Sequence, residues 1–182
     1  MEFDQHPMWK FSLAVYGAPG VAAACLDLQE RRGADVNLVL YAAFVGISGR
    51  GRIDAGELAA CRAALAPWAR EVVGRLRQVR RALKPGAGVE FGADWAALGE
   101  PAAALRRQVA ALEIEAEKLA QQALAGRLAA LPAAPDRDDD AAGRRAAALA
   151  NIRAYLAVLP GGQPARDEAA LATFETALAT AI

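Results

Sequence analysis

A twelve-residue segment, Val36 to Ile47, is apolar at every position except Asn37 and Gly46. Asp35 precedes it and is a residue type that commonly caps helix N-termini, so the pattern predicts a helix beginning there. A helix of this length spans about 18 Å, well short of the roughly 30 Å hydrocarbon core of a bilayer. Because it is apolar on every side, other helices must surround it. The segment therefore predicts the central helix of a bundle.

The rest of the chain also has a helical period. Apolar residues recur at spacings of three and four, alanine, leucine and arginine dominate, and no convincing β-hairpin pattern is present. Further helices are expected over residues 8–15, 19–32, 54–67, 68–84, 101–131, 141–159 and 167–181. The predicted fold class is all-α: a multi-helix bundle with a fully apolar central helix and a long heptad-like helix in the second half.

The long helix expected from Pro101 to Leu131 carries a heptad-like stripe, made of Leu105, Val109, Leu112, Ala116, Leu119 and Ala123. Such a stripe serves equally for packing within the chain or for a dimer seam, so both remain open. A linker rich in proline and aspartate is expected from Pro132 to Asp140. The predicted organisation is a helical core over residues 1–131, followed by a linker and C-terminal helical hairpin over 132–182 that either docks on the core or stays loose.

Composition excludes several classes of function. Lysine plus arginine and aspartate plus glutamate both count 21, so no general attraction to nucleic acid or anionic membranes is expected. One histidine and two cysteines, Cys25 and Cys61, form neither a metal-binding nor a disulfide pattern. The first ten residues do not resemble a secretory signal. We therefore expect a cytoplasmic protein with no cofactor, no metal and no membrane span.

A polar group interrupts the apolar N-terminal region. Gln29, Asp35 and Asn37 fall where two buried helices are expected to meet. Trp9 and Tyr16 lie at roughly helical spacing and are interpreted as core residues, with the wall of a pocket as the alternative. A buried amide needs hydrogen-bonding partners, because leaving one unpaired costs roughly 1 to 3 kcal/mol. The group is interpreted as a capping and hydrogen-bonding network, with a ligand or partner site as the alternative.

A basic helix is expected from Trp68 to Lys84. One side carries the apolar stripe Val72, Leu76, Val79 and Leu83, while six positive charges lie elsewhere: Arg70, Arg75, Arg77, Arg80, Arg81 and Lys84. Arginine side chains suit phosphate oxygens, so RNA or ribosome association is one hypothesis. A solvated amphipathic face is the alternative, since no aromatic-rich RNA-binding pattern accompanies the charges.

The N-terminal region also resembles a known family. The residues that carry the resemblance are Trp9, Phe11, Ser12, Tyr16, Pro19 to Val21, Cys25, Leu26, Leu28, Gln29, Gly33, Asp35 to Leu38 and Leu40. Together they resemble the opening of the proteobacterial domain-of-unknown-function 2390 family, over roughly the first half of the chain and not beyond Lys84. Phe44 departs from the tryptophan expected there. The resemblance implies a bacterial cytoplasmic protein and names no activity.

Three functional hypotheses follow. The first is a non-enzymatic helical protein that binds a protein partner, because the chain has polar groups without recognisable catalytic chemistry. The second is a small-ligand binder or enzyme with a polar site at Gln29, Asp35 and Asn37, which requires an open pocket around them. The third is RNA or ribosome association through the basic helix. A homo-oligomer is compatible with the first.

Overall fold

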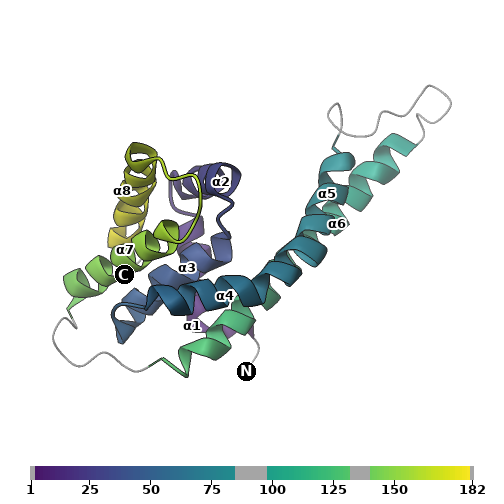
Figure 1. The fold of residues 1–182 in the computed structure, drawn as a ribbon. Coiled ribbons are helices and arrows are strands. Elements are labelled where there is room, and N and C mark those ends of the chain that lie inside the picture. The colour runs from purple at the N-terminus through teal and green to yellow at the C-terminus, as the bar shows by residue number, and fades with distance from the viewer. Residues whose placement is uncertain (1–2, 85–97, 132–139, 181–182) are drawn as a thin grey trace. The chain divides into compact units, whose positions relative to one another are not determined.

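The computed structural model describes residues 3–84, 98–131 and 140–180 (Figure 1). The loop expected around Gly86 to Gly92 and most of the linker expected from Pro132 to Asp140 lie outside these residues. The described elements, in chain order, are η1 (Phe3–Gln5), α1 (Pro7–Tyr16), α2 (Val21–Arg32), α3 (Val36–Val45), η2 (Gly46–Arg50), α4 (Ala55–Trp68), η3 (Ala69–Val73), α5 (Gly74–Ala82), α6 (Gly99–Leu128), α7 (Ala141–Ala157) and α8 (Pro164–Thr180). All are helical, which confirms the predicted all-α fold.

The chain divides into two compact units. Unit 1 comprises Met1–Ala64 and Gln121–Ile182, and unit 2 comprises Leu65–Ala120. Two helices, α4 and α6, each pass from one unit into the other. This division differs from the expected boundary at residue 131, because α7 and α8 pack within the same unit as α1, α2 and α3.

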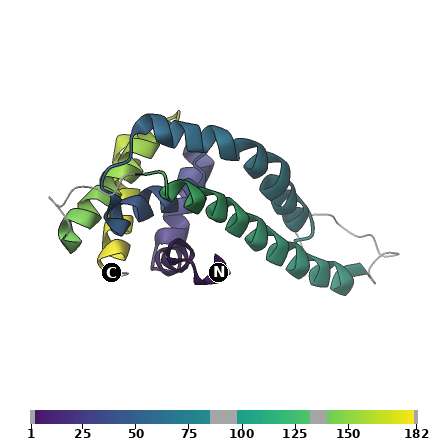
Figure 2. The same ribbon diagram turned by 90° about the horizontal axis from the view of Figure 1, so that it is seen from below.

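The predicted central helix is α3, in unit 1. Every residue from Asn37 to Val45 is buried. Direct neighbours of α3 are α1, η2 and α7, while α2 packs on α8, and α8 also contacts α7 and α1 (Figures 1 and 2). The apolar side chains of α3 are shielded from water because helices from both ends of the chain cover them.

At their crossing, α3 and α7 approach so closely that only small residues fit. Gly46 follows the last residue of α3, and a methyl group added to it would lie 2.6 Å from the Ala148 Cα and 2.7 Å from the Ala147 carbonyl carbon. The close approach lets Asn151 of α7 reach the backbone around η2. Its amide group donates to the carbonyls of Ala42 (3.2 Å) and Gly51 (3.0 Å).

The connection between α1 and α2 is a sharp turn. Pro19 lies in this turn and not at the first helical position as expected, because Gly20 has a φ of 82° and α2 begins only at Val21. Among the described residues, no single helix is both long and apolar enough to cross a membrane. Only as a pair, bent by 93°, do α1 and α2 meet that criterion of length and composition.

Pro67 does not end its helix. It lies inside α4, and the chain continues through the π-helical turn Ala69–Val73 into α5. Proline removes one backbone donor and clashes with the preceding turn, and a wider helical turn is one way in which a helix accommodates such a defect. The separate helix expected from Trp68 is thus a continuation of α4 with a change of winding.

Replacing Gly46 with alanine should destabilise unit 1. The new methyl group collides with the α7 backbone, which cannot rotate away as a side chain can, so a loss of about 1 to 3 kcal/mol or more is expected. Gly126→Ala is the matched control: Gly126 has no neighbour within 4 Å of the added carbon, and alanine is favoured over glycine in a helix by about 1 kcal/mol. Urea denaturation should lower the midpoint for the first variant and not for the second.

Candidate functional site

Two residues of the predicted polar group, Asp35 and Asn37, form hydrogen bonds within the fold. The Asp35 carboxylate accepts from the Asn37 backbone N–H at 2.9 Å and so caps α3, while the Asp35 N–H donates to the Tyr155 hydroxyl at 2.9 Å. The buried Asn37 side chain accepts from the Gln121 amide at 3.1 Å. Asp35 and Asn37 thus have internal partners on α6 and α7.

The other candidates of that group lie apart from any common pocket that the structure describes. Gln29 is half-buried and its backbone carbonyl accepts from the N–H of Gly33, which ends α2 with a φ of 62° as expected. Trp9 is buried, with its ring 6.1 Å from that of Phe3, whereas Tyr16 is exposed at the end of α1. None of the five predicted residues lines the groove described next.

An open groove of about 320 Å³ runs between α2 and α8. Its walls are mostly small side chains: Gly20, Ala23, Ala24, Ala169, Ala170 and Thr173. Asp27 and Arg166 form an ion pair across it. With its only charged lining residues paired to each other, the groove offers a ligand an apolar, shallow surface and no free polar anchor.

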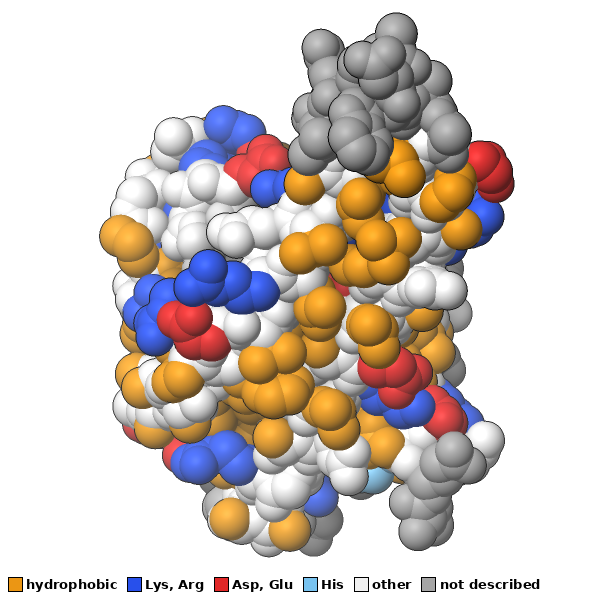
Figure 3. All heavy atoms as spheres, turned by 90° about the vertical axis from the view of Figure 1, so that its right-hand side faces the viewer, with side chains coloured by type: hydrophobic (Ala, Val, Ile, Leu, Met, Phe, Trp, Pro, Cys, Tyr) orange, Lys and Arg blue, Asp and Glu red, His pale blue; other side chains and the backbone are white. Residues whose placement is uncertain are grey.

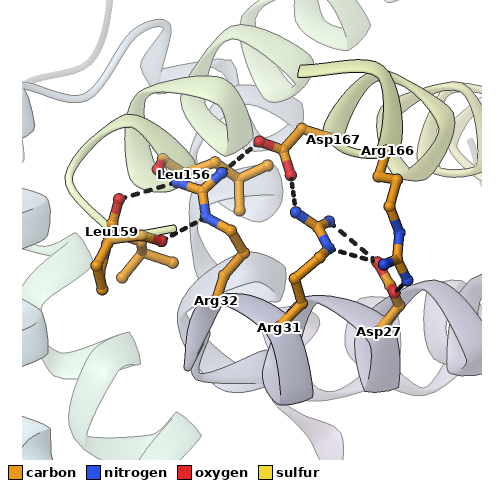
Figure 4. A network of polar contacts seen from close by, with 8 residues as sticks. Asp27, Arg31, Arg32, Leu156, Leu159, Arg166 and Asp167 are labelled. Carbon is orange, nitrogen blue, oxygen red and sulfur yellow. Dashed lines mark hydrogen bonds and ion pairs between the residues drawn. The ribbon is translucent and has the colours of Figure 1, made fainter. Parts of the chain in front are cut away.

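Beside this groove, one arginine is buried between α2 and the α7–α8 connection (Figure 4). The Arg32 guanidinium donates to the carbonyls of Leu156, Leu159 (2.9 Å) and Pro160 (2.8 Å). It also forms an ion pair with Asp167, whose other oxygen accepts from Arg31 at 2.8 Å. A buried charge with a carboxylate and three carbonyl partners is a structural anchor.

Sequence reasoning missed Arg32, Gln121 and Asn151, each of which is buried and hydrogen-bonded to a distant segment. For Asn151 the available signal was an amide within the apolar run of α7, as for Asn37 in α3. Arg32 gave no such signal, because an arginine at the C-terminal end of a helix is also the usual surface arrangement.

Nucleophilic and metal-binding chemistry has little support among the described residues. Burial raises the pKa of Cys25 to about 12 and that of Cys61 to about 11, so both thiols are protonated at neutral pH. The Nδ1 atom of His6 accepts from the Met8 N–H at 3.2 Å and caps α1. In the described ranges, no three histidine, cysteine or acidic side chains are grouped to hold a metal ion.

Most charges of the predicted basic helix face carboxylates within unit 2. Arg77 donates to Glu113 and Glu117, both at 2.9 Å, and Arg80 donates to Glu113. Arg70 and Arg75 both pair with Glu71. The remaining two, Arg81 and Lys84, are exposed. Arg77 and Arg80 therefore point toward α6.

The heptad-like stripe of α6 is divided. Val109 and Ala116 are buried, whereas Leu105, Leu112 and Leu119 are 47%, 56% and 52% exposed. The exposed leucines recur every seven residues, and Leu98, seven residues before Leu105, is exposed as well. Seven residues are nearly two helical turns, so these leucines form one line along α6.

The helices α5 and α6 form an antiparallel pair, here called the hairpin. The apolar stripe of α5 lies on the same side of this hairpin as the line of leucines on α6. The inward row is formed by Val73, the last residue of η3, with Arg77 and Arg80 of α5. Leu76 and Val79 of α5, and Leu83 just after it, lie roughly a quarter turn from this row. In α6 the leucines lie at a similar rotation, in the same sense, from the inward Val109, Glu113 and Ala116. Because α5 and α6 run in opposite directions, both stripes point to one side.

We call this apolar surface the hairpin face. It is defined by Leu76, Val79 and Leu83 of α5 with Leu98, Leu105, Leu112 and Leu119 of the α6 side. Figure 3, a view from the right-hand side of Figure 1, shows hydrophobic side chains among charged ones. Val79 and the four leucines of the α6 side are exposed, and Leu76 and Leu83 are half-buried. Exposed apolar side chains that gather on one surface mark candidate interaction sites.

Removing the Arg32 charge should loosen the C-terminal helices. In Arg32→Leu, three carbonyls and one side of Asp167 lose their donor, so a loss of about 3 kcal/mol is expected, the scale for breaking a buried ion pair. Arg153→Leu is the control, because Arg153 also joins α7 to α8 but its pair with Glu168 is exposed, and solvent-screened pairs of this kind contribute little to stability. Hydrogen exchange should accelerate in α7 and α8 peptides for the first variant only.

The stability contribution of Glu113 should depend on pH. Burial alone would raise the pKa of its carboxyl group, but hydrogen bonds from Arg80 and Arg77 lower it. The resulting pKa of Glu113 lies below the usual value of 4.5. A carboxyl group with a lowered folded pKa stabilises the fold above its unfolded pKa and loses this effect as pH falls through the folded value.

The Glu113→Gln variant should therefore be about 2 kcal/mol less stable than the wild type above pH 4.5, because two arginines then face a neutral amide. Urea midpoints measured from pH 7 downward should show this difference shrinking below pH 4.5. Glu100→Gln, in the same helix but well exposed, should show little difference at any pH; an equal effect there would contradict the assignment to Glu113.

Comparison with known proteins agrees with the resemblance seen in the sequence. No curated protein and no solved structure matches the chain. One family model, described as protein of unknown function (DUF2390), matches residues 7–124, which extends past Lys84 and through most of α6. Because this match covers more than half of the chain, the protein belongs to the DUF2390 family.

Proposed function

We propose that this chain is a non-enzymatic bacterial protein of the cytoplasm that binds a protein partner through the hairpin face of unit 2. The observation that carries the proposal is the row of exposed leucines at seven-residue spacing on α6, beside the apolar stripe of α5. A regular apolar row on a helix is suited to receive another helix along its length.

The interior of the hairpin strengthens this interpretation. The buried hydrophobic side chains described in unit 2 are Leu65, Val73, Val109, Ala116 and Ala120, of which two are only alanines. Arginine and glutamate fill much of the space between α5 and α6. Helix pairs are stabilised mainly by burial of their apolar faces, and here the larger leucines lie outside. Covering the hairpin face with a partner would supply the missing burial.

The competing hypotheses have weaker support. A site at Gln29, Asp35 and Asn37 requires free polar groups in a pocket, but the Asp35 carboxylate accepts from the Asn37 backbone N–H and the Asn37 side chain accepts from Gln121. RNA association requires free positive charge, but four of the six cations of the basic helix face Glu71, Glu113 or Glu117. A cytoplasmic compartment agrees with two buried cysteines that are both free thiols.

Site-specific photocrosslinking in the cell tests the proposal. A photoreactive residue at Leu112 should give an adduct heavier than one chain. The same residue at Ile114 should give none, because Ile114 is equally exposed, at 57%, but lies on another side of α6. Equal adducts at both positions, no adduct at Leu112, or crosslinks confined to the same chain would each contradict partner binding through the hairpin face.

A further inference from the structure

We infer that the partner covering the hairpin face is a second copy of this chain, so that two hairpins form an intermolecular four-helix bundle. The inference rests on the proposed function, since it requires the hairpin face to be an interface. A seven-residue leucine repeat is the spacing at which helices pack along their whole length in such bundles. A second identical hairpin supplies the same repeat in the matching length.

The face is two helices wide around Leu112. Arg77 bonds Glu113 and Glu117, so the α5 stripe from Leu76 to Leu83, about 10 Å long, lies beside this part of α6. A second copy presents the same two helices, so the α5 stripe of each copy can cover the Leu112 region of the other.

Charges at the edges of the face are self-complementary. Arg75 borders the α5 edge and Glu115 the α6 edge. Each has an ion pair within its own chain, with Glu71 and Lys118 respectively, but the two side chains remain 68% and 63% exposed and can bind a second charge. Arg77 bonds both Glu113 and Glu117. The midpoint of these glutamates is Glu115, so Arg75 and Glu115 differ in level by only about 3 Å along the hairpin.

These positions define one symmetric arrangement. When the two-fold axis runs parallel to the helices, α5 of one copy lies over α6 of the other. The rotation does not change the height of a residue along the axis. Arg75 of each copy then faces Glu115 of the other, on both edges of the bundle. Paired opposite charges at the rim fix the register of an interface whose centre is leucine.

Analytical ultracentrifugation of the full chain tests the inference. The wild type should sediment with twice the 19.0 kDa mass of one chain at micromolar concentration. Leu112→Glu should weaken the dimer at least tenfold, because it buries charges against each other at the centre of the interface. Ile114→Glu, on another side of the same helix, should leave the dimer unchanged, and far-UV circular dichroism checks that both variants fold.

A charge exchange tests the arrangement itself. Arg75→Glu and Glu115→Arg should each weaken the dimer, and the double exchange should restore it. A wild type that is monomeric at every concentration, or a dimer insensitive to Leu112→Glu, would overturn the inference. An adduct at position 112 with a different protein would then leave the proposed function standing, whereas the absence of any such adduct would remove both.

Discussion

The close approach of α3 and α7 is the constraint on which unit 1 depends. An apolar helix must be covered on every side, and α7 comes near enough to do so only because Gly46 and Ala148 present almost no side chain at the crossing. At this distance Asn151 bonds backbone groups on both sides of η2 and also accepts from the Ile53 N–H at 2.9 Å. The same contact thus buries α3 and positions the chain that leads into α4.

This arrangement makes the family region dependent on residues that follow it. The family match ends at residue 124, before α7 and α8 begin. Within the matched region, however, Arg32 finds all its partners between Leu156 and Asp167, and the Asp35 N–H donates to Tyr155. Buried polar groups without partners would cost several kcal/mol together. In this chain, the C-terminal helices are therefore part of the fold of the family region.

The sequence predicted those features that are set by local rules. The helical period, the apolar α3, the Asp35 cap and the Gly33 terminus depend on neighbours a few residues away. Features set by distant residues were not predictable in this way. The inward orientation of Arg77 and Arg80 depends on Glu113, more than thirty positions later, and Asn37 depends on Gln121. An amphipathic pattern gives a helix an apolar side, but it does not say which side faces the neighbouring helix.

In unit 2 this ambiguity has a physical consequence. The same leucine repeat fits packing within the chain or between chains, and the choice is made by what fills the space between α5 and α6. Because Arg77 and Arg80 occupy that space with Glu113 and Glu117, the leucines are left a quarter turn away on the surface. A charged layer between two helices contributes less than an apolar one, since desolvation offsets much of the ion-pair energy. A hairpin built in this way leaves its large leucine side chains on its surface.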